Sequence, residues 1–533
     1  MALRPRAYTR GVGKYVQVSG HASADVIVRN YEELRELGAG AFGKVSLVRD
    51  KRFGIDKVIK VVSTKDMQRE TIEMMKKEIE LLRSLDHPSI VKLYEYAEDA
   101  HKMQLIFVLE YINGGDCLDL IKDSAGPLEE PLLARLMYQV IVALSYCHQN
   151  GVIHRDIKPD NMMVLRCPET NDIDCKLIDF GLAERAHGAI HETAGTPKYM
   201  APEVHRRMPY TQKADVWSIA VTALHLFIGE GPFLRPYNET IPQYLKFGDL
   251  EPRLESFDGW QIRTPEAKSF ARDLLIVDPA ARPSARDLVD HDWFIAYQPP
   301  PCRFPKEMAR SLAAYTSAPP IVRCLLFSIA ARIGSPNFRA VGATFLAADS
   351  DGDGLITHED LREALQDMDG WKWWWDSASK VDVDKVLETA DLNHSGGLCF
   401  SEFAAACLIG HHESDDDLAK HAFYALDHAR CGQVVVKDIR NLFRERDVAF
   451  LDSLPQDRPF TLEEWVQCIH EFIKECPSSP KSRSPSSAST PEEMGFSDYF
   501  IMCKGHRARN DTGGNYGSFV SSCPDDGLVT IPD

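Results

Sequence analysis

The sequence predicts an α+β unit followed by an all-α unit. A strand, strand, helix order comes first: residues 36–48 alternate apolar and polar positions around glycines, residues 57–62 are a short β-rich run, and residues 69–85 have helical spacing. Residues 103–111 predict another strand, and residues 131–148 predict a long helix with one apolar face. After about residue 126 helices dominate.

The all-α unit is predicted by a repeat in the second half of the chain. A helix, an acidic loop and a helix recur with loops that begin at Asp349, Asp391 and Asp427. Before this repeat, residues 298–302 (QPPPC) break the pattern and a connector with two short amphipathic stretches follows. From Cys476 the composition turns to Ser and Pro, which cannot bury enough apolar surface to order the chain, so we expect a disordered tail.

Composition excludes several classes of protein. Of 533 residues, 44 % are hydrophobic and 26 % are charged, as in ordinary globular proteins. The net charge of −18 disfavours nucleic-acid binding, because an acidic surface repels phosphates. Thirteen cysteines without a C-x-x-C pair suggest reduced thiols. No run approaches the roughly 18 apolar residues of a membrane span, and Ala2 is not the glycine that myristoylation needs, so we expect a soluble cytoplasmic protein.

A glycine loop and a series of ordered motifs carry the chemistry of the first unit. The loop from Leu37 to Val45 lets backbone N–H groups approach a polyphosphate, but alone it fits a plain hairpin turn equally well. Order and spacing decide the matter, because Lys60 closes a β-rich run, Glu78 lies on the next helix, and His154-Arg155-Asp156, Asn161 and Asp179-Phe180-Gly181 follow in sequence.

Residues 31–294 therefore closely resemble the eukaryotic-type protein kinase family, with further matches at Ala201-Pro202-Glu203, Asp215-Val216-Trp217-Ser218 and Arg282-Pro283-Ser284. The resemblance implies the bilobal α+β protein kinase fold, with ATP and Mg²⁺ as cofactors and protein substrates. The pair Lys158-Pro159 resembles serine/threonine rather than tyrosine kinases. Catalysis would depend on positioning and charge stabilisation more than on covalent chemistry.

The resemblance assigns a task to each matched residue. Asp156 would orient the substrate hydroxyl, and Lys158 would neutralise charge on the moving phosphoryl group; Asn161 and Asp179 would bind Mg²⁺. Asp116 would face the ribose or a basic substrate side chain, with a helix N-cap as the alternative. Lys60 would hold the α- and β-phosphates and pair with Glu78. The expected ATP-binding residues are Leu37, Gly38, Ala39, Gly40, Ala41, Phe42, Gly43, Lys44, Val45, Lys60, Glu78, Glu110, Ile112 and Asp116.

The activation segment, residues 182–200, offers only Thr193 and Thr196 as aliphatic hydroxyls. Thr196 resembles the substrate-loop threonine of the family rather than a switch. Glu192 could partner Arg155 without a phosphate, so we expect activity that does not require phosphorylation of this segment.

Two acidic loops match the EF-hand calcium pattern in full. Each places oxygen ligands at positions 1, 3 and 5, a glycine at 6, an apolar residue at 8 and a carboxylate at 12. In the first loop the last carboxylate is Asp360, whose side chain is shorter than that of the usual glutamate and could admit Mg²⁺. The expected Ca²⁺ ligands are Asp349, Asp351, Asp353, Leu355 and Asp360 in the first loop, and Asp391, Asn393, Ser395, Gly397 and Glu402 in the second.

Two further hands are degenerate. The loop from Asp427 to Asp438 offers Ala429 and Cys431 where oxygen ligands are wanted, so we expect no ion there. Residues 460–465 keep only the end of a fourth loop and predict a structural partner hand. The run of tryptophans within residues 371–375 fits core packing better than an exposed docking patch.

The order kinase, connector, EF-hands resembles the calcium-dependent protein kinase family over residues 31–472. In that family the connector is an autoinhibitory junction that calcium remodels. The alternative is an amphipathic helix that packs on its neighbours and has no regulatory role. The resemblance predicts an α+β bilobal protein kinase fold followed by an all-α EF-hand calcium-binding domain. The expected domains are an extension (1–30), the kinase (31–294), the junction (295–340), the EF-hands (341–475) and the tail (476–533). Within the extension, residues 1 to about 28 are basic with little periodicity and predict a loosely ordered lead.

We therefore expect a monomeric signalling enzyme, a calcium-regulated serine/threonine kinase. Asp116 and Asp160 hint at substrates with basic residues near the target hydroxyl, although His225 stands where some basophilic kinases carry an acid. Two alternatives stay open: a constitutive kinase with structural EF-hands, and a catalytically silent calcium-responsive scaffold.

Overall fold

The computed structural model describes residues 24–467, apart from residues 41–42, 125, 168–171, 187, 230–246, 298–303, 319, 332–338, 367–380, 410–414, 428–430 and 437–457. The chain divides after Ser482 into two compact units, and every described residue belongs to the first unit. The tryptophan run and the predicted disordered tail lie outside the described residues.

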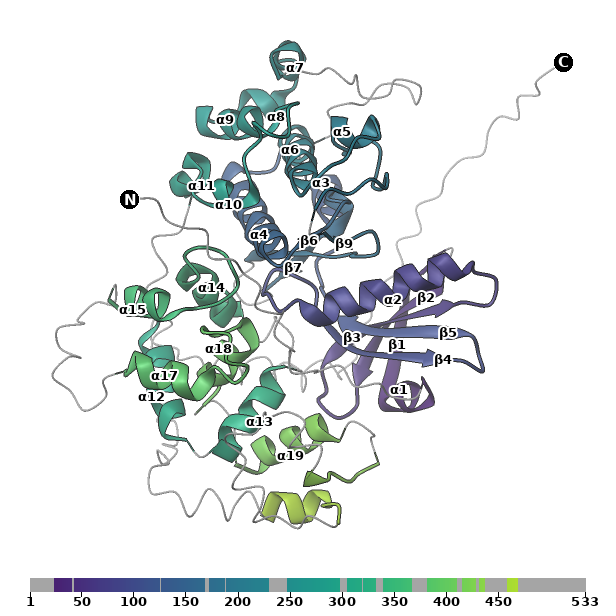
Figure 1. The fold of residues 1–533 in the computed structure, drawn as a ribbon, viewed down its shortest axis with the longest axis vertical. Coiled ribbons are helices and arrows are strands. Elements are labelled where there is room, and N and C mark those ends of the chain that lie inside the picture. The colour runs from purple at the N-terminus through teal and green to yellow at the C-terminus, as the bar shows by residue number, and fades with distance from the viewer. Residues whose placement is uncertain are drawn as a thin grey trace, which may run out of the picture. The chain divides into compact units, whose positions relative to one another are not determined.

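The amino-terminal lobe is a five-stranded antiparallel sheet in the order β1-β2-β3-β5-β4, with helix α2 beside it (Figure 1). Strand β5 is nearly all apolar because both of its faces are covered: Leu105 and Phe107 belong to one apolar cluster, and Ile106 and Val108 belong to another. The elements are β1 (Tyr31–Gly40), β2 (Gly43–Asp50), β3 (Asp56–Ser63), α2 (Arg69–Ser84), β4 (Leu93–Asp99) and β5 (Gln104–Glu110).

A short helix precedes this sheet where we expected a loosely ordered lead. Helix α1 (Ala24–Asn30) buries Ala24 and Ile27 against an apolar cluster of the sheet that includes Tyr94 and Val108. Burial of these two side chains supplies a reason for order that the basic composition of the first residues hides. The prediction is therefore wrong for the last residues of the lead.

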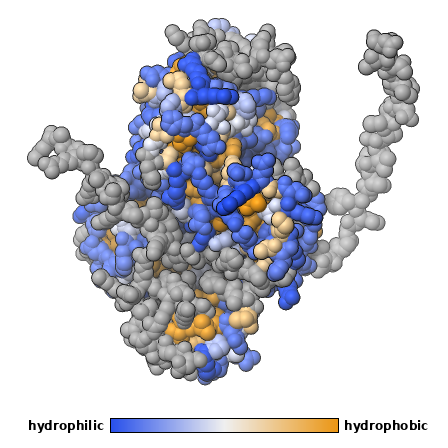
Figure 2. Space-filling model, turned by 45° about the vertical axis from the view of Figure 1, so that its right-hand side comes forward, coloured by the Kyte–Doolittle hydropathy of each residue, from blue (hydrophilic) through white to orange (hydrophobic). Residues whose placement is uncertain are grey.

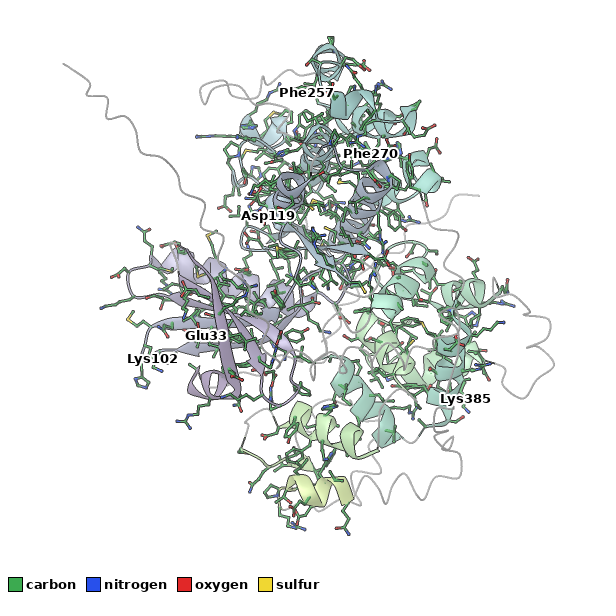
Figure 3. All side chains as sticks on the ribbon, turned by 180° about the vertical axis from the view of Figure 1, so that it is seen from behind. Glu33, Lys102, Asp119, Phe257, Phe270 and Lys385 are labelled. Atoms are coloured by element: carbon green, nitrogen blue, oxygen red, sulfur yellow. The ribbon has the colours of Figure 1, made fainter. Side chains whose placement is uncertain are left out.

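The carboxy-terminal lobe is mainly helical, and α4 and α6 lie at its centre (Figure 1). Both helices are apolar nearly all round because other elements cover them on several sides. Phe270 of α9, labelled in Figure 3, packs on Trp293 with 4.8 Å between ring centroids. The helices are α3 (Cys117–Asp123), α4 (Glu130–Gln149), α5 (Pro202–His205), α6 (Lys213–Ile228), α7 (Phe247–Leu254), α8 (Asp258–Gln261), α9 (Pro265–Leu274), α10 (Ala285–Val289) and α11 (Asp292–Tyr297).

Two short antiparallel ribbons carry the loops between the lobes. Strand β6 (Val152–Ile153) pairs with β9 (Glu184–Arg185), and β7 (Met162–Arg166) pairs with β8 (Ile173–Leu177). A single 3₁₀ turn, Pro159–Asn161, lies between β6 and β7. This arrangement brings the residues after β6 close to those after β8.

The second half of the described chain is all helical, as predicted. The acidic loops are paired through single β-bridges, Ile356 with Leu398 and Val434 with Phe460. The helices are α12 (Lys306–Ser317), α13 (Pro320–Ala330), α14 (Arg339–Ala348), α15 (His358–Gln366), α17 (Val383–Ala390), α18 (Phe400–Cys407) and α19 (Asp415–Leu426). The fold class predicted from the sequence is thus confirmed.

The two connector helices pack on this second half. Helix α12 contacts α17 and α18, and α13 contacts α18 and α19. The apolar side chains Met308, Leu312 and Leu325 are buried in these contacts. The connector thus packs on the helices of the EF-hand half, and its role as a junction stays a prediction.

The described surface on the face shown in Figure 2 is mostly hydrophilic, with smaller apolar patches. Among the described helices, none is long and apolar enough to cross a membrane.

A buried ion pair in the carboxy-terminal lobe provides a test of the fold. Arg282, 1 % exposed, donates to Glu203 through Nη1 at 2.8 Å and Nη2 at 3.1 Å. Arg282→Met leaves the Glu203 carboxylate buried without its cation, which should lower the free energy of unfolding by about 3–5 kcal/mol. Chemical denaturation of the full-length protein, followed by tryptophan fluorescence, measures this change.

The control is Arg272→Met, which breaks an exposed ion pair with Glu251 and should cost no more than about 1 kcal/mol. Equal losses in the two variants would show that the buried pair has no special part in stability.

Candidate active site and calcium loops

The glycine loop joins β1 to β2 at the open side of the sheet. Gly43 is required by packing, since a Cβ there would lie 1.9 Å from the carbonyl oxygen of Val61. A Cβ at Gly38 would meet nothing within 4 Å, and Leu37 is 41 % exposed. Ala41 and Phe42 lie outside the described residues. The loop therefore has free space on the side of Gly38, where a polyphosphate could lie.

Lys44 is turned to the sheet surface, where it pairs with Glu33 and Glu36. Figure 3 labels Glu33 on this sheet. Hydrogen bonds from Lys44 and Ser46 lower the pKa of Glu33. Only the backbone of Lys44 thus fits the phosphate-binding role expected of this residue.

Lys60 and Glu78 come near each other without forming the expected ion pair. Among the described residues, no salt bridge within 4.0 Å joins them, and Lys60 Nζ lies 5.5 Å from the Phe107 ring centroid. Burial raises the pKa of Glu78, the charge of Lys60 lowers it, and Asp179 raises it further. A Cβ on Gly181 would lie 3.6 Å from Glu78 Oε2 and 3.1 Å from Asp179 Oδ1. Glu78 is therefore beside the Asp179 turn rather than on Lys60.

Asp156 is the centre of a dense set of hydrogen bonds. Its Oδ1 accepts from Thr196 N at 2.9 Å and Oγ1 at 2.6 Å, and its Oδ2 accepts from Lys158 Nζ at 2.7 Å and Asn161 Nδ2 at 3.1 Å. Burial acts to raise the pKa of Asp156, but the hydrogen bonds from Lys158 and Thr196 outweigh it and lower the pKa. The Thr196 hydroxyl occupies the position in which a substrate hydroxyl could donate to this carboxylate.

The loop around Asp156 is held by a residue that sequence reasoning matched to the family but gave no role. Asp215, fully buried on α6, accepts from His154 N at 2.9 Å and Arg155 N at 2.8 Å. These bonds support the left-handed backbone of Arg155, whose φ is 69°. An aspartate within the apolar stretch Ala214 to Trp217 is the signal that could have revealed it, because a buried carboxylate needs donors.

Asp179 and Asn161 offer oxygen ligands on either side of this loop. Asn161 uses its amide nitrogen to donate to Asp156 O at 2.8 Å, which leaves its side-chain oxygen for a cation. Asp179 also has a left-handed backbone, with φ 61°. The ring of His154 packs on Phe180 at 4.8 Å and bonds to Ile178 O at 3.0 Å, which ties the two loops together. Carboxylate and amide oxygens are ligands suited to Mg²⁺.

Glu110 and Asp116 lie after β5, where the lobes join. The Glu110 side chain forms a buried ion pair with Lys176 at 2.9 Å, so only its backbone is suited to reading an adenine edge. Ile112 is buried close by in the chain. Asp116 caps α3, where its Oδ1 accepts from Asp119 N at 2.8 Å. The structure thus shows the N-cap role for Asp116, and its second carboxylate oxygen is not used in this cap.

The activation segment contains the predicted contact between Arg155 and Glu192. Arg155 Nη1 donates to Glu192 Oε2 at 3.4 Å, and the Tyr210 hydroxyl donates to Glu192 O at 2.8 Å. Thr193 is exposed beside them. A carboxylate therefore already satisfies the arginine next to Asp156.

The first calcium loop gathers three carboxylates. Ligand oxygens of Asp349, Asp351 and Asp353 lie within 4.8 Å of one another. Burial and the neighbouring carboxylates raise the pKa of Asp349 to about 8 and that of Asp353 to about 6. A divalent cation would remove this repulsion, so the donor set fits Ca²⁺ or Mg²⁺. Asp360 accepts from Ser350 and Thr357 within the loop, and Leu355 supplies the position-7 carbonyl.

The second calcium loop shows an unsatisfied ligand. Asn393 Oδ1, at loop position 3, is buried and has no hydrogen-bond partner within the described part of the chain. Glu402 accepts from Asn393 N at 3.2 Å and Cys399 N at 2.9 Å, while burial raises its pKa to about 8. Asp391 accepts from Ser395 N at 2.9 Å. A buried oxygen without a donor is suited to a cation, so these residues and the Gly397 carbonyl fit Ca²⁺.

The third loop retains the EF-hand turn with different chemistry. Asp427 accepts from Cys431 N at 3.0 Å and from Gly432 N at 2.8 Å, and Cys431 presents sulfur at ligand position 5. In the fourth hand Trp465 is buried and donates to Ala419 O at 2.9 Å. Ala429 lies outside the described residues.

Contacts join the calcium loops to the kinase lobes. Ser401, next to Glu402, donates through N and Oγ to the Asp86 carboxylate, both at 2.9 Å, and Lys92 Nζ donates to Ser401 Oγ at 3.1 Å. Asp86 lies two residues beyond α2. In the first loop, Gly352 O accepts from Gln149 at 2.8 Å. A change at either loop therefore reaches the kinase lobes through direct contacts.

Comparison with known proteins agrees with this geometry. Residues 31–294 match the family model described as protein kinase domain, and residues 341–365 match the model described as EF hand. The chain is thus a protein kinase that carries an EF-hand.

Its relatives narrow the class. The chain is 30 % identical over 414 residues to calcium-dependent protein kinase 5 of Plasmodium berghei, a match that covers 76 % of this chain and 70 % of the relative. It is 28 % identical over 416 residues to calcium-dependent protein kinase 34 of Arabidopsis thaliana, with 77 % of each covered. The chain belongs to the calcium-dependent protein kinase family, whose cofactors are ATP, Mg²⁺ and Ca²⁺, and the resemblance seen in the sequence is confirmed.

Asp156→Asn provides the test of the catalytic loop. Loss of the carboxylate charge should lower kcat at least about 100-fold, the scale of a lost general base, while leaving ATP binding unchanged. Peptide phosphorylation and calorimetric titration with a non-hydrolysable ATP analogue measure the two quantities. The control is Asp273→Asn, which removes an exposed carboxylate of α9. Activity of the Asp156 variant near that of the control would refute the assignment.

Thr193→Ala should leave turnover unchanged, because Glu192 already pairs with Arg155. Glu192→Gln should lower turnover by up to about fivefold, since an exposed ion pair contributes no more than about 1 kcal/mol. Steady-state rates of the two variants at saturating calcium provide the comparison. A collapse in rate on removal of the Thr193 hydroxyl would show that phosphorylation of this segment is required.

Proposed function

We propose that this chain transfers the γ-phosphoryl group of ATP to serine and threonine hydroxyls of proteins, and that calcium at its EF-hands controls the transfer. The observation that carries the catalytic part is the cluster of Asp156, Lys158, Asn161 and Thr196, joined by hydrogen bonds of 2.6–3.1 Å. ATP with Mg²⁺ supplies the phosphoryl group and spreads its charge when bound. The domain limits expected from the sequence are part of this proposal.

In the proposed mechanism Asp156 positions the acceptor hydroxyl. Its lowered pKa keeps it ionised, so it accepts a hydrogen bond readily but is a weak base. This property suits a loose transition state, in which the proton leaves late and orientation matters most. Lys158 would move from Asp156 toward the phosphoryl oxygens, while Asn161 and Asp179 would hold Mg²⁺. Lys60 would contact the α- and β-phosphates once Glu78 fixes its ammonium.

The calcium part of the proposal depends on the second loop. Among the described residues Asn393 Oδ1 has no hydrogen-bond partner, and a bound cation would give it one. Glu402 is buried with a raised pKa, and the same cation would favour its charged form. Ser401 joins this loop to Asp86 beyond α2, the helix that carries Glu78. An ion that reorders Glu402 would thereby bear on the position of α2. Asp360 is bound within its own loop, which favours a structural ion, Mg²⁺ or Ca²⁺, at the first loop.

The preference for basic substrates, the monomeric state and the cytoplasmic location of the enzyme are also proposals. The carboxylates of Asp119, Asp116 and Asp160 all raise the pKa of Lys122, so they form one acidic group around α3. Such a group favours substrates with basic residues near the target hydroxyl. We further propose a monomeric enzyme in the cytoplasm, because none of the cysteines that the structure describes forms a disulfide.

The test is phosphate transfer to a basic peptide by the full-length protein at fixed Mg²⁺, with free calcium varied from chelated to about 100 μM. We expect a rise with a midpoint within the sensor range, on the order of 10⁻⁷ to 10⁻⁵ M. Glu402→Gln removes a bidentate carboxylate and should abolish most of the rise. Glu388→Gln, an exposed change on the same hand, should leave it intact.

Each other outcome has a separate meaning. Equal activity at all calcium levels would favour the constitutive kinase, and no activity at any level would favour the scaffold. Unchanged activation in the Glu402 variant would move the sensor role to the first loop.

A further inference from the structure

Helix α2 is fastened to strand β9 at two points. Lys77, near the middle of the helix, forms an ion pair with Glu184, and Ser84, its last residue, accepts a hydrogen bond from Arg185. Seven residues, about two turns, separate the two points, so they fix both the tilt and the rotation of the helix. Sequence reasoning gave no role to Glu184 or Arg185.

Strand β9 is itself anchored to the catalytic loop. It pairs with β6, with Ile153 opposite Glu184, directly before the residues that carry Asp156. Arg155 Nη2 also lies 3.7 Å from Glu184 Oε2. Glu184 therefore connects a helix of the amino-terminal lobe with the loop that holds the proposed catalytic carboxylate.

The position of Lys77 determines where Glu78 can go. Adjacent residues on an α-helix project about 100° apart, so a tether on Lys77 sets the direction of Glu78. In this structure Glu78 lies beside Gly181 and Asp179, and no salt bridge within the described residues joins it to Lys60. The α2 rotation held by Glu184 is thus one in which the ammonium that should contact ATP lacks its carboxylate.

We propose that Glu184 is a positioning residue that, through Lys77, holds α2 in the rotation that keeps Glu78 away from Lys60. Release of Lys77 lets α2 turn and the pair between Lys60 and Glu78 form, which raises activity before calcium binds. This inference rests on the proposed kinase function and adds a residue that sets its resting level. Ser401 of the second calcium loop bonds to Asp86, two residues beyond α2, and this contact is the route by which calcium would oppose the tether.

The size of the effect follows from exposure. The side chains of Lys77 and Glu184 are 44 % and 24 % exposed, and an ion pair of this kind shifts an equilibrium by about two- to fivefold. The tether is therefore weak enough for a bound ion to overcome.

The test uses Lys77→Met in the full-length protein, with peptide phosphorylation measured in chelator and at saturating calcium. We expect the rate in chelator to rise about two- to fivefold and the KM for ATP to fall, with the rate at saturating calcium unchanged. Lys77→Arg, which retains the ion pair, should behave as the wild type. Lys76→Met removes a neighbouring exposed ion pair of the same helix, with Glu98, and should change neither quantity.

A chelator rate that is unchanged or lower in the Lys77→Met protein overturns the proposal, provided that its thermal unfolding matches that of the Lys76→Met control. An equal rise in both variants also overturns it, because the effect would then belong to any charge lost from α2. Failure of the proposed function looks different, since the wild type itself would then show no transfer or no response to calcium.

Discussion

The active site depends on one buried carboxylate, Asp215. It carries its charge inside the carboxy-terminal lobe, where burial alone would raise its pKa, yet bonds from His148 and from the backbone of the catalytic loop lower it. In return it stabilises a left-handed conformation at Arg155 that few non-glycine residues adopt. Asp156, Lys158 and Asn161 follow directly, so their convergence depends on a residue that touches none of the reacting groups.

The direction of pKa shift separates two kinds of buried acid in this chain. Asp156, Asp174 and Asp215 have lowered pKa values because donors inside the protein satisfy them. Glu78, Asp349 and Glu402 have raised values because they lack enough donors or cations. The second group contains the acids that need a partner from elsewhere, either a metal ion or the ammonium of Lys60.

Much of the fold and the site could be predicted from the sequence, because spacing and residue type encode them. The kinase motifs and the two complete acidic loops are local patterns, and the elements that carry them form where expected. Two features could not be predicted. Helix α1 depends on two apolar contacts made across the sheet, and the gap between Lys60 and Glu78 depends on how α2 is rotated. Each is set by tertiary packing rather than by local sequence.

The bridge between Ile356 and Leu398 has a consequence for the response to calcium. The two residues exchange both backbone hydrogen bonds at 2.9 Å, so the calcium loops share one small piece of sheet. An ion bound in one loop restricts the backbone of the other, and the second ion then has less conformational entropy to remove. A structural ion in the first loop would in this way tighten the binding of calcium to the second loop, and its loss would lower the sensitivity of the enzyme to calcium.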